Sequence, residues 1–395
     1  MTNPRDGDAV RFLHSADWQL GMTRRFLGAE SQSVFTADRL GAVASLGEQA
    51  VDLGAQFMVV AGDTFEDNAV PRSVVLRAVE VLSSFPVPVL LLPGNHDPLD
   101  VASVFRCRDF SAAVDGGPVT VLDGSEPVEV LPGVEVLGVP WTSKRPDPSR
   151  LPTLLASLEP TENLRVLVAH GGTDEIYGGH SPSVEAIAVA PLEEAIEAGT
   201  VDYVALGDRH SVTRVGSGDR IWFSGSPETT DFDDVEVNSG HALLVEIGRA
   251  PASGGRGMCT VTPLRTGRWS FRAVDARIDT DSDLDALVER VEAVQDKPRT
   301  VLKIGLTGTV TVAVRARIDE LLDTWDALFA SAFLRESRTH LVVRAEDSDF
   351  TDLVGGYAGR AVADLVEMAA GGGDRSEDAG HALSLLYRLV DGAAR

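Results

Sequence analysis

The first half of the chain alternates the patterns of buried strands and amphipathic helices. Apolar runs at 57–61 and 89–92 have the composition of buried strands, and each breaks into a polar turn. Residues 33–53 and 71–85 place apolar side chains at helical spacing, and Pro71 stands near the start of the second helix, a favourable place for it. Strands that alternate with helices predict parallel pairing through right-handed crossovers.

The pattern changes from about residue 118. Short alternating or apolar runs at 119–122, 128–130 and 134–139 predict shorter strands of a second sheet. Further strands are expected near 165–169 and 202–206.

A glycine-rich stretch at 249–258 indicates a flexible turn or a boundary. Beyond it, a small α+β unit is expected, with strands at 259–264, 269–274, 300–306 and 339–344 and helices at 281–294 and 316–332. Two more helices are predicted in the tail, at 351–370 and 378–394, and Leu383, Leu386, Tyr387 and Val390 share one face of the second. The expected parts are 1–248, 258–347 and 348–395.

Composition narrows the class of protein. The 395 residues include two cysteines, Cys107 and Cys259, so a disulfide framework is not expected and a reducing cytoplasm is the default location. No apolar run approaches the roughly 18 residues of a membrane span, and the first residues lack a signal-peptide pattern. We therefore expect a cytoplasmic protein without a membrane segment.

The formal net charge of −25 argues against a simple nucleic-acid binder, because phosphate contacts draw their affinity from Lys and Arg. A nuclease is still compatible with this charge, since metals, a few local arginines or a partner can hold DNA while the rest of the surface is acidic. Substrate-binding residues stay unassigned, because each basic residue that follows a strand end is equally well an ordinary surface charge. These residues are Arg24, Arg25, Arg72, Lys144, Arg145 and Arg150.

Candidate chemistry lies at the ends of five apolar runs, which should converge on one edge of the sheets. Carboxylate, amide and imidazole groups in this mixture suit divalent metals such as manganese, iron or zinc, and the absence of cysteine argues against a thiolate site. The residues delivered to this edge are Asp17, Gln19, Asp63, Asn95, His96, His170, Asp208 and His210.

The order of these motifs, D-x-(H), G-D, G-N-H-D, H-G and G-(H)-x-H, resembles the calcineurin-like metallophosphoesterase superfamily. Within it, Ser224–Phe232 resembles the G-S-x-E stretch of SbcD-type DNA repair nucleases. The resemblance covers roughly the first 235 residues. It implies an α/β fold with a four-layer αββα core (1–248), a small α+β capping domain (258–347) and a C-terminal helical segment (348–395).

The resemblance also implies two divalent metals, with manganese first and magnesium, iron or zinc as alternatives. Asp63 would bridge them, and His96 would protonate the leaving oxygen while Asp97 orients it. One metal would lie among Asp17, Gln19, Asp63 and His210, and the other among Asp63, Asn95, His170 and Asp208.

Three positions depart from the family pattern. Gln19 and Asp208 stand where the family has histidine, and Glu66 stands where histidine or aspartate is common. Asp208 is a competent hard ligand that favours manganese or magnesium. Gln19 either binds through its amide oxygen or leaves the first metal site loose or empty.

Three functions are compatible with these sequence features. The first is a manganese-dependent DNA exo/endonuclease subunit in DNA repair, a homodimer whose tail docks an SMC-like ATPase of the SbcC type. The second is a phosphodiesterase or phosphatase for a small phosphoester. The third is a non-catalytic scaffold with a degraded metal site.

Overall fold

The computed structural model describes residues 9–124, 126–145, 147–177, 186–248, 257–344, 356–371, 375–376, 378–383 and 385–386. The chain divides into two units. Unit 1 comprises Met1–Arg24, Gln32–Asp231 and Val235–Trp269, and unit 2 comprises Arg25–Ser31, Phe232–Asp234 and Ser270–Arg395. No helix within the described ranges is long and apolar enough to cross a membrane.

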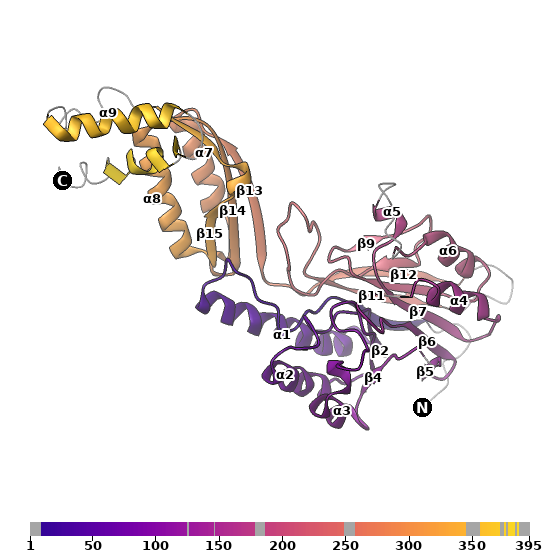
Figure 1. The fold of residues 1–395 in the computed structure, drawn as a ribbon. Coiled ribbons are helices and arrows are strands. Elements are labelled where there is room, and N and C mark those ends of the chain that lie inside the picture. The colour runs from indigo at the N-terminus through magenta and orange to yellow at the C-terminus, as the bar shows by residue number, and fades with distance from the viewer. Residues whose placement is uncertain are drawn as a thin grey trace. The chain divides into compact units, whose positions relative to one another are not determined.

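The first sheet of unit 1 has six strands in the order β12-β11-β1-β2-β3-β4. Strands β2, β4, β11 and β12 of this sheet are labelled in Figure 1. The four strands from β1 to β4 are parallel, and β11 and β12 add an antiparallel edge. Their bounds are β1 Val10–Ser15, β2 Phe57–Val60, β3 Val89–Leu91, β4 Val119–Val121, β11 His241–Ile247 and β12 Cys259–Arg265.

Two of these strands lie elsewhere than the sequence indicated. β4 was expected in the second sheet, but it pairs in parallel with β3 after the crossover helix α3 (Arg108–Val114). A strand of three residues carries too little pattern to identify its partner. β12 pairs with β11 along its whole length, so unit 1 continues beyond residue 248.

The second sheet of unit 1 has the order β5-β6-β7-β8-β10-β9, with four parallel strands flanked by the antiparallel strands β5 and β9. The bounds are β5 Val128–Leu131, β6 Val134–Val139, β7 Leu164–His170, β8 Tyr203–Gly207, β9 Thr213–Arg214 and β10 Ile221–Phe223.

The two sheets pack face to face through an apolar core. Phe12 of the first sheet stacks on Phe57 at 4.8 Å between ring centroids and meets the edge of Tyr203 from the second sheet at 5.5 Å. His14 bridges the sheets, with Nδ1 3.1 Å from the Tyr203 hydroxyl and Nε2 3.2 Å from the Leu206 carbonyl oxygen. Burial lowers the pKa of His14 to about 3, so this histidine is a neutral member of the core.

Helices cover the outer face of each sheet and complete the predicted four-layer αββα arrangement. Apolar residues of α1 (Ala29–Asp52), α2 (Arg72–Ser83) and α3 share a core cluster with the first sheet. Residues of α4 (Arg150–Ser157) and α6 (Val189–Glu197) share another with the second sheet. The short helix α5 spans Asp174–Tyr177.

Unit 2 is built on one long strand, β14 (Thr300–Thr311), to which three other strands are parallel. β13 (Ser270–Arg277) pairs along one edge, while β15 (Ser331–Leu334) and β16 (His340–Arg344) pair in succession along the other. The helices are α7 Asp281–Glu292, α8 Val312–Leu328 and α9 Gly356–Ala370.

The helix predicted at 316–332 begins and ends four residues earlier. The Thr311 side chain accepts a hydrogen bond from the Val314 amide at the start of α8, and the chain turns extended at Phe329. This leaves residues 331–334 free to form β15, which the helical pattern concealed.

Only part of the predicted helical tail lies within the described residues. α9 occupies most of the first predicted helix, whereas residues 351–355 and most of 378–394, including Tyr387 and Val390, lie outside the described residues. Leu383 is described, and it is buried in the apolar core of unit 2.

Candidate metal centre

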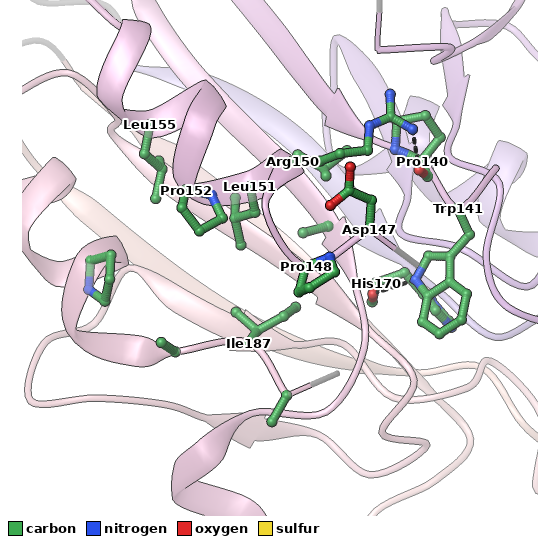
Figure 2. Close-up of a pocket in the computed structure, with 15 residues that line it drawn as sticks. Pro140, Trp141, Asp147, Pro148, Arg150, Leu151, Pro152, Leu155, His170 and Ile187 are labelled. Carbon is green, nitrogen blue, oxygen red and sulfur yellow. Dashed lines mark hydrogen bonds between the residues drawn. The ribbon is translucent and has the colours of Figure 1, made fainter. Parts of the chain in front are cut away.

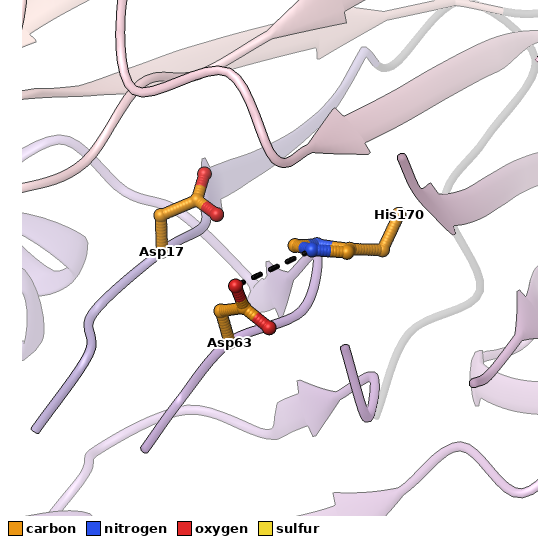
Figure 3. Close-up of side chains that lie close together, drawn as sticks. All are labelled: Asp17, Asp63 and His170. Carbon is orange, nitrogen blue, oxygen red and sulfur yellow. Dashed lines mark ion pairs between the residues drawn. The ribbon is translucent and has the colours of Figure 1, made fainter. Parts of the chain in front are cut away.

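Five strands end at one edge of the two sheets and carry the predicted site. Asp17, Asp63 and Asn95 follow β1, β2 and β3, while His170 ends β7 and Asp208 follows β8. Carboxyl ends of parallel strands share an edge, which is why residues far apart in sequence converge here. Ligand atoms of Asp17, Asp63 and His170 all lie within 4.8 Å of one another (Figure 3).

One group of candidate ligands surrounds the His170 ring. Its Nε2 lies 2.6 Å from Asn95 Oδ1, 3.4 Å from Asp63 Oδ2 and 3.9 Å from Asp208 Oδ1. Its Nδ1 lies 2.7 Å from the carbonyl oxygen of Ala61. An Nδ1–H that donates to this oxygen leaves the Nε2 lone pair free to face the carboxylates, as a metal ligand requires.

A second group surrounds Asp17. Its carboxylate accepts the backbone amide of Asp208 at 3.0 Å, and its Oδ1 lies 3.9 Å from His210 Nε2. Gln19 places its Nε2 3.4 Å from the same His210 nitrogen. All seven predicted metal ligands are therefore brought together, with Asp63 close to both groups.

The backbone at these residues adopts rare conformations. Asp17, Gln19, Asp63 and Asp208 have positive φ angles of 54°, 44°, 55° and 98°, and they are four of the five such non-glycine residues in the described ranges. A positive φ outside glycine costs of order 1–3 kcal/mol and persists where surrounding structure enforces it. Here the Asp17 amide donates to the Gly62 carbonyl at 3.0 Å and the Gln19 amide to the Asp63 carbonyl at 2.8 Å.

The stretch that carries the SbcD-type resemblance, Ser224–Phe232, contacts the loop that carries Asp17. The Ser226 hydroxyl donates to the carbonyl oxygen of Asp17 at 2.7 Å. Glu228 is fully buried and accepts the backbone amides of Arg268 and Trp269 at 2.9 and 3.0 Å. These contacts give the stretch a structural role next to the candidate ligands.

His210 has a partner that sequence reasoning missed. Its Nδ1 lies 2.7 Å from Glu236 Oε1, an arrangement that directs Nε2 toward Asp17 and resembles the carboxylate–histidine pairs behind metal ligands. Glu236 lies 26 residues downstream, in a loop outside every motif. The pairing of His210 with Glu236 can be recognised only from the three-dimensional structure.

Burial and mutual interactions shift the pKa values of Asp17, His210 and Glu236. Burial raises the pKa of Asp17 to about 7, against the opposing effect of His210. Burial disfavours the charged form of His210, but its hydrogen bond to Glu236 and the charge of Asp17 outweigh this and raise its pKa to about 9. Burial also opposes ionisation of Glu236, yet the bond to His210 lowers the pKa of Glu236 to about 2.

The residues present fit a divalent cation. The Gln19 side chain is buried, and its Oε1 has no hydrogen-bond partner. An unpaired buried oxygen is costly, and a cation among these oxygen and nitrogen donors would satisfy it. The donor set contains no sulfur, in agreement with the hard-ion preference expected from the sequence.

His96 and Asp97 have different surroundings. The backbone amide of His96 donates to Asp63 Oδ1 at 2.9 Å, its Nδ1 lies 2.7 Å from the Glu66 carbonyl oxygen, and its partly exposed ring holds Nε2 4.0 Å from Asp63 Oδ2. Asp97 is fully buried and accepts the amides of Phe65 and Gly94 at 2.9 and 2.8 Å. The carbonyl of Glu66, and not the predicted Asp97, therefore orients the His96 ring, while Asp97 holds the loop that carries it.

Three of the basic residues that follow strand ends differ in whether their side chains contact the candidate site. Lys144 donates from Nζ to the carbonyl oxygens of Asn95 and His96, both at 2.8 Å, so its charge lies beside the candidate site. Arg72 pairs with Asp109, and Arg150 donates to the Pro140 carbonyl oxygen. Of these three, Lys144 is the best-placed candidate for a phosphate contact.

Replacing Gly62 by alanine is expected to weaken metal binding and lower stability by about 2 kcal/mol or more. Gly62 has a φ of +96°, and a Cβ there would lie 2.0 Å from His170 Nδ1. The matched control is Gly41→Ala in α1, where a Cβ meets nothing within 4 Å. Calorimetric metal titration and thermal unfolding of both variants check this, and an unaltered metal affinity in Gly62→Ala would contradict it.

Comparisons with known proteins agree with this geometry. Residues 10–212 match the family model described as calcineurin-like phosphoesterase. The SbcD subunit of the nuclease SbcCD from Escherichia coli K12 is 25% identical over 259 residues, which cover 57% of this chain and 62% of that protein. The DNA double-strand break repair protein Mre11 of Archaeoglobus fulgidus is 28% identical over 225 residues, which cover 51% of this chain and 46% of that protein.

The matches to these curated relatives thus span about half to three fifths of their lengths. A solved structure of the protein TT1561 from Thermus thermophilus aligns with 60% of this chain and 94% of its own, at 13% identity and a TM-score of 0.37, which is too distant to bear on function. The family match covers the strands, loops and candidate ligands from Asp17 to His210. The chain belongs to the calcineurin-like phosphoesterase family.

Proposed function

We propose that this chain is a metal-dependent DNA phosphodiesterase, an exo/endonuclease of the SbcD type acting in DNA repair. The observation that carries the proposal is the convergence of seven candidate ligands into two groups that share the neighbourhood of Asp63. The similarity to SbcD and Mre11 proteins favours DNA over other phosphodiesters.

In this proposal two divalent ions, manganese first, supply an activated water and neutralise charge at the phosphate when bound. Asp17, Gln19, Asp63 and His210 hold one ion, and Asp63, Asn95, His170 and Asp208 hold the other. His170 and His210 are kept in the ligand tautomer by Ala61 and Glu236.

His96 is the proposed general acid. The Glu66 carbonyl fixes its Nδ1, which leaves Nε2 at the metal edge, and its side chain is 37% exposed, so a substrate can reach it. Protonation of the leaving oxygen needs such a donor within hydrogen-bond reach of the substrate. Lys144, next to His96, adds a positive charge for the phosphate.

Unit 2 and the tail carry the remaining parts of the proposal. Residues 270–347, the part of the expected capping domain 258–347 that lies in unit 2, would act as a cap. Residues 348–395 would dock an SMC-like ATPase of the SbcC type, with the nuclease chain as a homodimer. Burial of Leu383 in the core of unit 2 limits the docking face to other tail residues, such as the exposed Met368 and Leu385. With a net charge of −25, DNA binding by the isolated chain should be weak and sensitive to salt.

The direct test is cleavage of labelled double- and single-stranded DNA with added manganese, with and without a chelator. Bis(p-nitrophenyl) phosphate serves as a second substrate. Manganese-dependent DNA cleavage is the expected result. Hydrolysis of the small ester alone would favour the second candidate function, and no hydrolysis with no bound metal would favour the scaffold.

A phosphodiesterase acting on a small phosphoester is the second candidate, and one cavity favours it. A pocket of about 260 Å³ adjoins His170 and is lined mainly by apolar side chains, including Trp141, Leu151 and Ile187 (Figure 2). The Trp141 indole donates to the His170 carbonyl oxygen at 2.7 Å, so the pocket wall is tied to a candidate metal ligand. Pockets that bind drug-sized ligands have volumes of roughly 300–1,000 Å³, so this smaller pocket suits one ring of a small leaving group.

Filling this pocket tests whether it binds the leaving group of a small phosphoester. If the pocket binds the leaving group, Leu151→Trp should raise the KM for bis(p-nitrophenyl) phosphate about tenfold, the size of effect expected when one apolar contact is lost. The control is Leu76→Trp at an exposed position of α2. Steady-state kinetics check this, and equal KM values in the two variants would show that the pocket does not bind the leaving group.

A further inference from the structure

Arg39 is a buried arginine of α1 whose guanidinium links two loops of unit 1. The residue is 2% exposed, and its terminal nitrogens donate to the carbonyl oxygens of Trp18 and Thr229, both at 2.9 Å. The guanidinium carbon also lies 4.9 Å from the centroid of the Phe35 ring, in the geometry of a cation–π contact. Arg39, Trp18 and Thr229 all belong to unit 1, so this link is made within one unit.

The first contact fixes the peptide group that joins Trp18 to Gln19. Its carbonyl oxygen accepts from Arg39, and its N–H donates to the Asp63 carbonyl oxygen at 2.8 Å. Because a peptide group is planar, a hydrogen bond on each side fixes its orientation. This plane lies between Asp17 and Gln19, whose positive φ angles persist where the surroundings enforce them. Arg39 thus contributes to the direction of two candidate ligands.

The second contact fixes the peptide group that joins Thr229 to Thr230 in the same way. Its carbonyl oxygen accepts from Arg39, and its N–H donates to Glu236 Oε2 at 3.2 Å. The Thr230 hydroxyl oxygen and Glu236 Oε1 lie 2.6 and 2.7 Å from His210 Nδ1. The peptide group held by Arg39 therefore adjoins the partners of a third candidate ligand.

These contacts serve one of the two ligand groups. The ligands particular to one proposed metal are Asp17, Gln19 and His210. The other group is held by different contacts, since the Ala61 carbonyl oxygen lies 2.7 Å from His170 Nδ1. The Asn95 carbonyl oxygen accepts from Lys144 at 2.8 Å. Loss of Arg39 is therefore expected to weaken one metal site more than the other.

The role requires an arginine in particular. Burial lowers the pKa of Arg39 to about 10, against the opposing charge of Glu228, so the side chain is a cation at neutral pH. Hydrogen bonds from a charged donor are stronger than those from a neutral one. The planar guanidinium donates in two fixed directions at once, whereas the ammonium of lysine is a single point on a flexible chain.

We propose that Arg39 is a positioning residue of the candidate metal centre, because its guanidinium fixes the two peptide groups that direct the ligands of one metal. The inference rests on the proposed function, in which Asp17, Gln19 and His210 bind that metal. It adds that a residue outside every motif of the site controls the affinity of one metal separately from that of the other.

Arg39→Lys is the first test, because it keeps a positive charge but loses the fixed pair of donors. Arg39→Met, which keeps an unbranched chain without the charge, replaces it should Arg39→Lys fail to fold. The matched control is Arg220→Lys. Arg220 is also buried and donates from its two terminal nitrogens to the carbonyl oxygens of Asp202 and Gly257. It precedes β10 at the amino ends of the parallel strands, opposite to the candidate ligands.

The first measurement is calorimetric titration of the metal-free full chain with manganese, after thermal unfolding has confirmed that each variant is folded. The unchanged chain should show two sites. In Arg39→Lys one site should weaken 10–100-fold, the usual effect of losing an outer partner of a ligand, while the other keeps its affinity. Electron paramagnetic resonance, at a manganese concentration between the two dissociation constants of the variant, should show an isolated ion instead of the coupled pair of the unchanged chain.

The second measurement requires no metal. Hydrogen–deuterium exchange at the amides of Gln19 and Thr230 should become about tenfold faster in metal-free Arg39→Lys, the change that corresponds to the loss of one charged hydrogen bond. Exchange in β7, which carries His170, should stay unchanged. Arg220→Lys should match the unchanged chain at these amides and in both manganese measurements.

Two manganese sites of unaltered affinity in a folded Arg39→Lys protein would overturn the inference. An equal loss at both sites, or the same change in Arg220→Lys, would also overturn it, because Arg39 would then support the fold in general. An unchanged chain that binds no manganese would contradict the proposed function. Exchange at Gln19 and Thr230 would still decide whether Arg39 fixes the two loops, so the two failures are distinguishable.

Discussion

Asp63→Asn is expected to abolish DNA cleavage and to weaken manganese binding by more than the 10–100-fold typical for an outer partner. Asp63 lies close to both ligand groups, within 4.8 Å of ligand atoms of Asp17 and His170. Its Oδ1 also accepts the His96 amide at 2.9 Å. Burial opposes its ionisation, yet the charge interactions and hydrogen bonds that Asp63 makes with His170 and His96 outweigh burial and lower the pKa of Asp63. Asparagine keeps the shape but removes the charge that a bridging ligand needs.

The control for this variant is Asp67→Asn in the same loop, where the exposed carboxylate accepts a local hydrogen bond from the Ala69 amide. Metal titration and DNA cleavage should be unchanged in the control. Full activity in Asp63→Asn would contradict the assignment of Asp63 as the shared ligand.

His96→Ala is expected to lower kcat for DNA by about 10²–10⁴-fold, the usual contribution of a general acid, while manganese affinity changes little. The loss should be smaller for bis(p-nitrophenyl) phosphate, because nitrophenolate leaves without a proton and a sugar oxygen does not. Kinetics on both substrates, with metal titration, measure the difference.

The control for His96 is His340→Ala on β16, an exposed histidine of unit 2. Equal losses on the two substrates in His96→Ala would indicate that the ring serves in binding or in shaping the loop, and would contradict its role as an acid.

Most of the candidate site could be predicted from the sequence, because the candidate ligands lie at the ends of apolar runs. Each candidate ligand lies at or shortly after the end of an apolar strand, and parallel strands of one sheet bring their ends together, so a shared edge for Asp17, Asp63 and Asn95 could be predicted. Asp63 and His170 follow strands of different sheets, and their proximity was implied by the family resemblance. Glu236 could not be predicted, because its contact with His210 is made by a loop and has no fixed spacing. The partner of the His96 ring was missed for a related reason, since a backbone carbonyl such as that of Glu66 carries no sequence signature.

The fold, like the site, could be predicted only in part from the sequence. The αββα layers follow from the alternation of strands and helices and from the resemblance. The sheet to which β4 belongs and the break between α8 and β15 depend on tertiary pairing, which short apolar segments do not encode on their own.

The central claim is a two-metal centre at the shared strand edge. The most direct measurement is anomalous X-ray diffraction, at the manganese absorption edge, from crystals of the full chain grown with manganese. We expect two peaks, one among Asp17, Gln19 and His210 and one among Asn95, His170 and Asp208, with Asp63 between them. A map with no peak at this edge of the sheets, or with manganese only elsewhere on the chain, would contradict it.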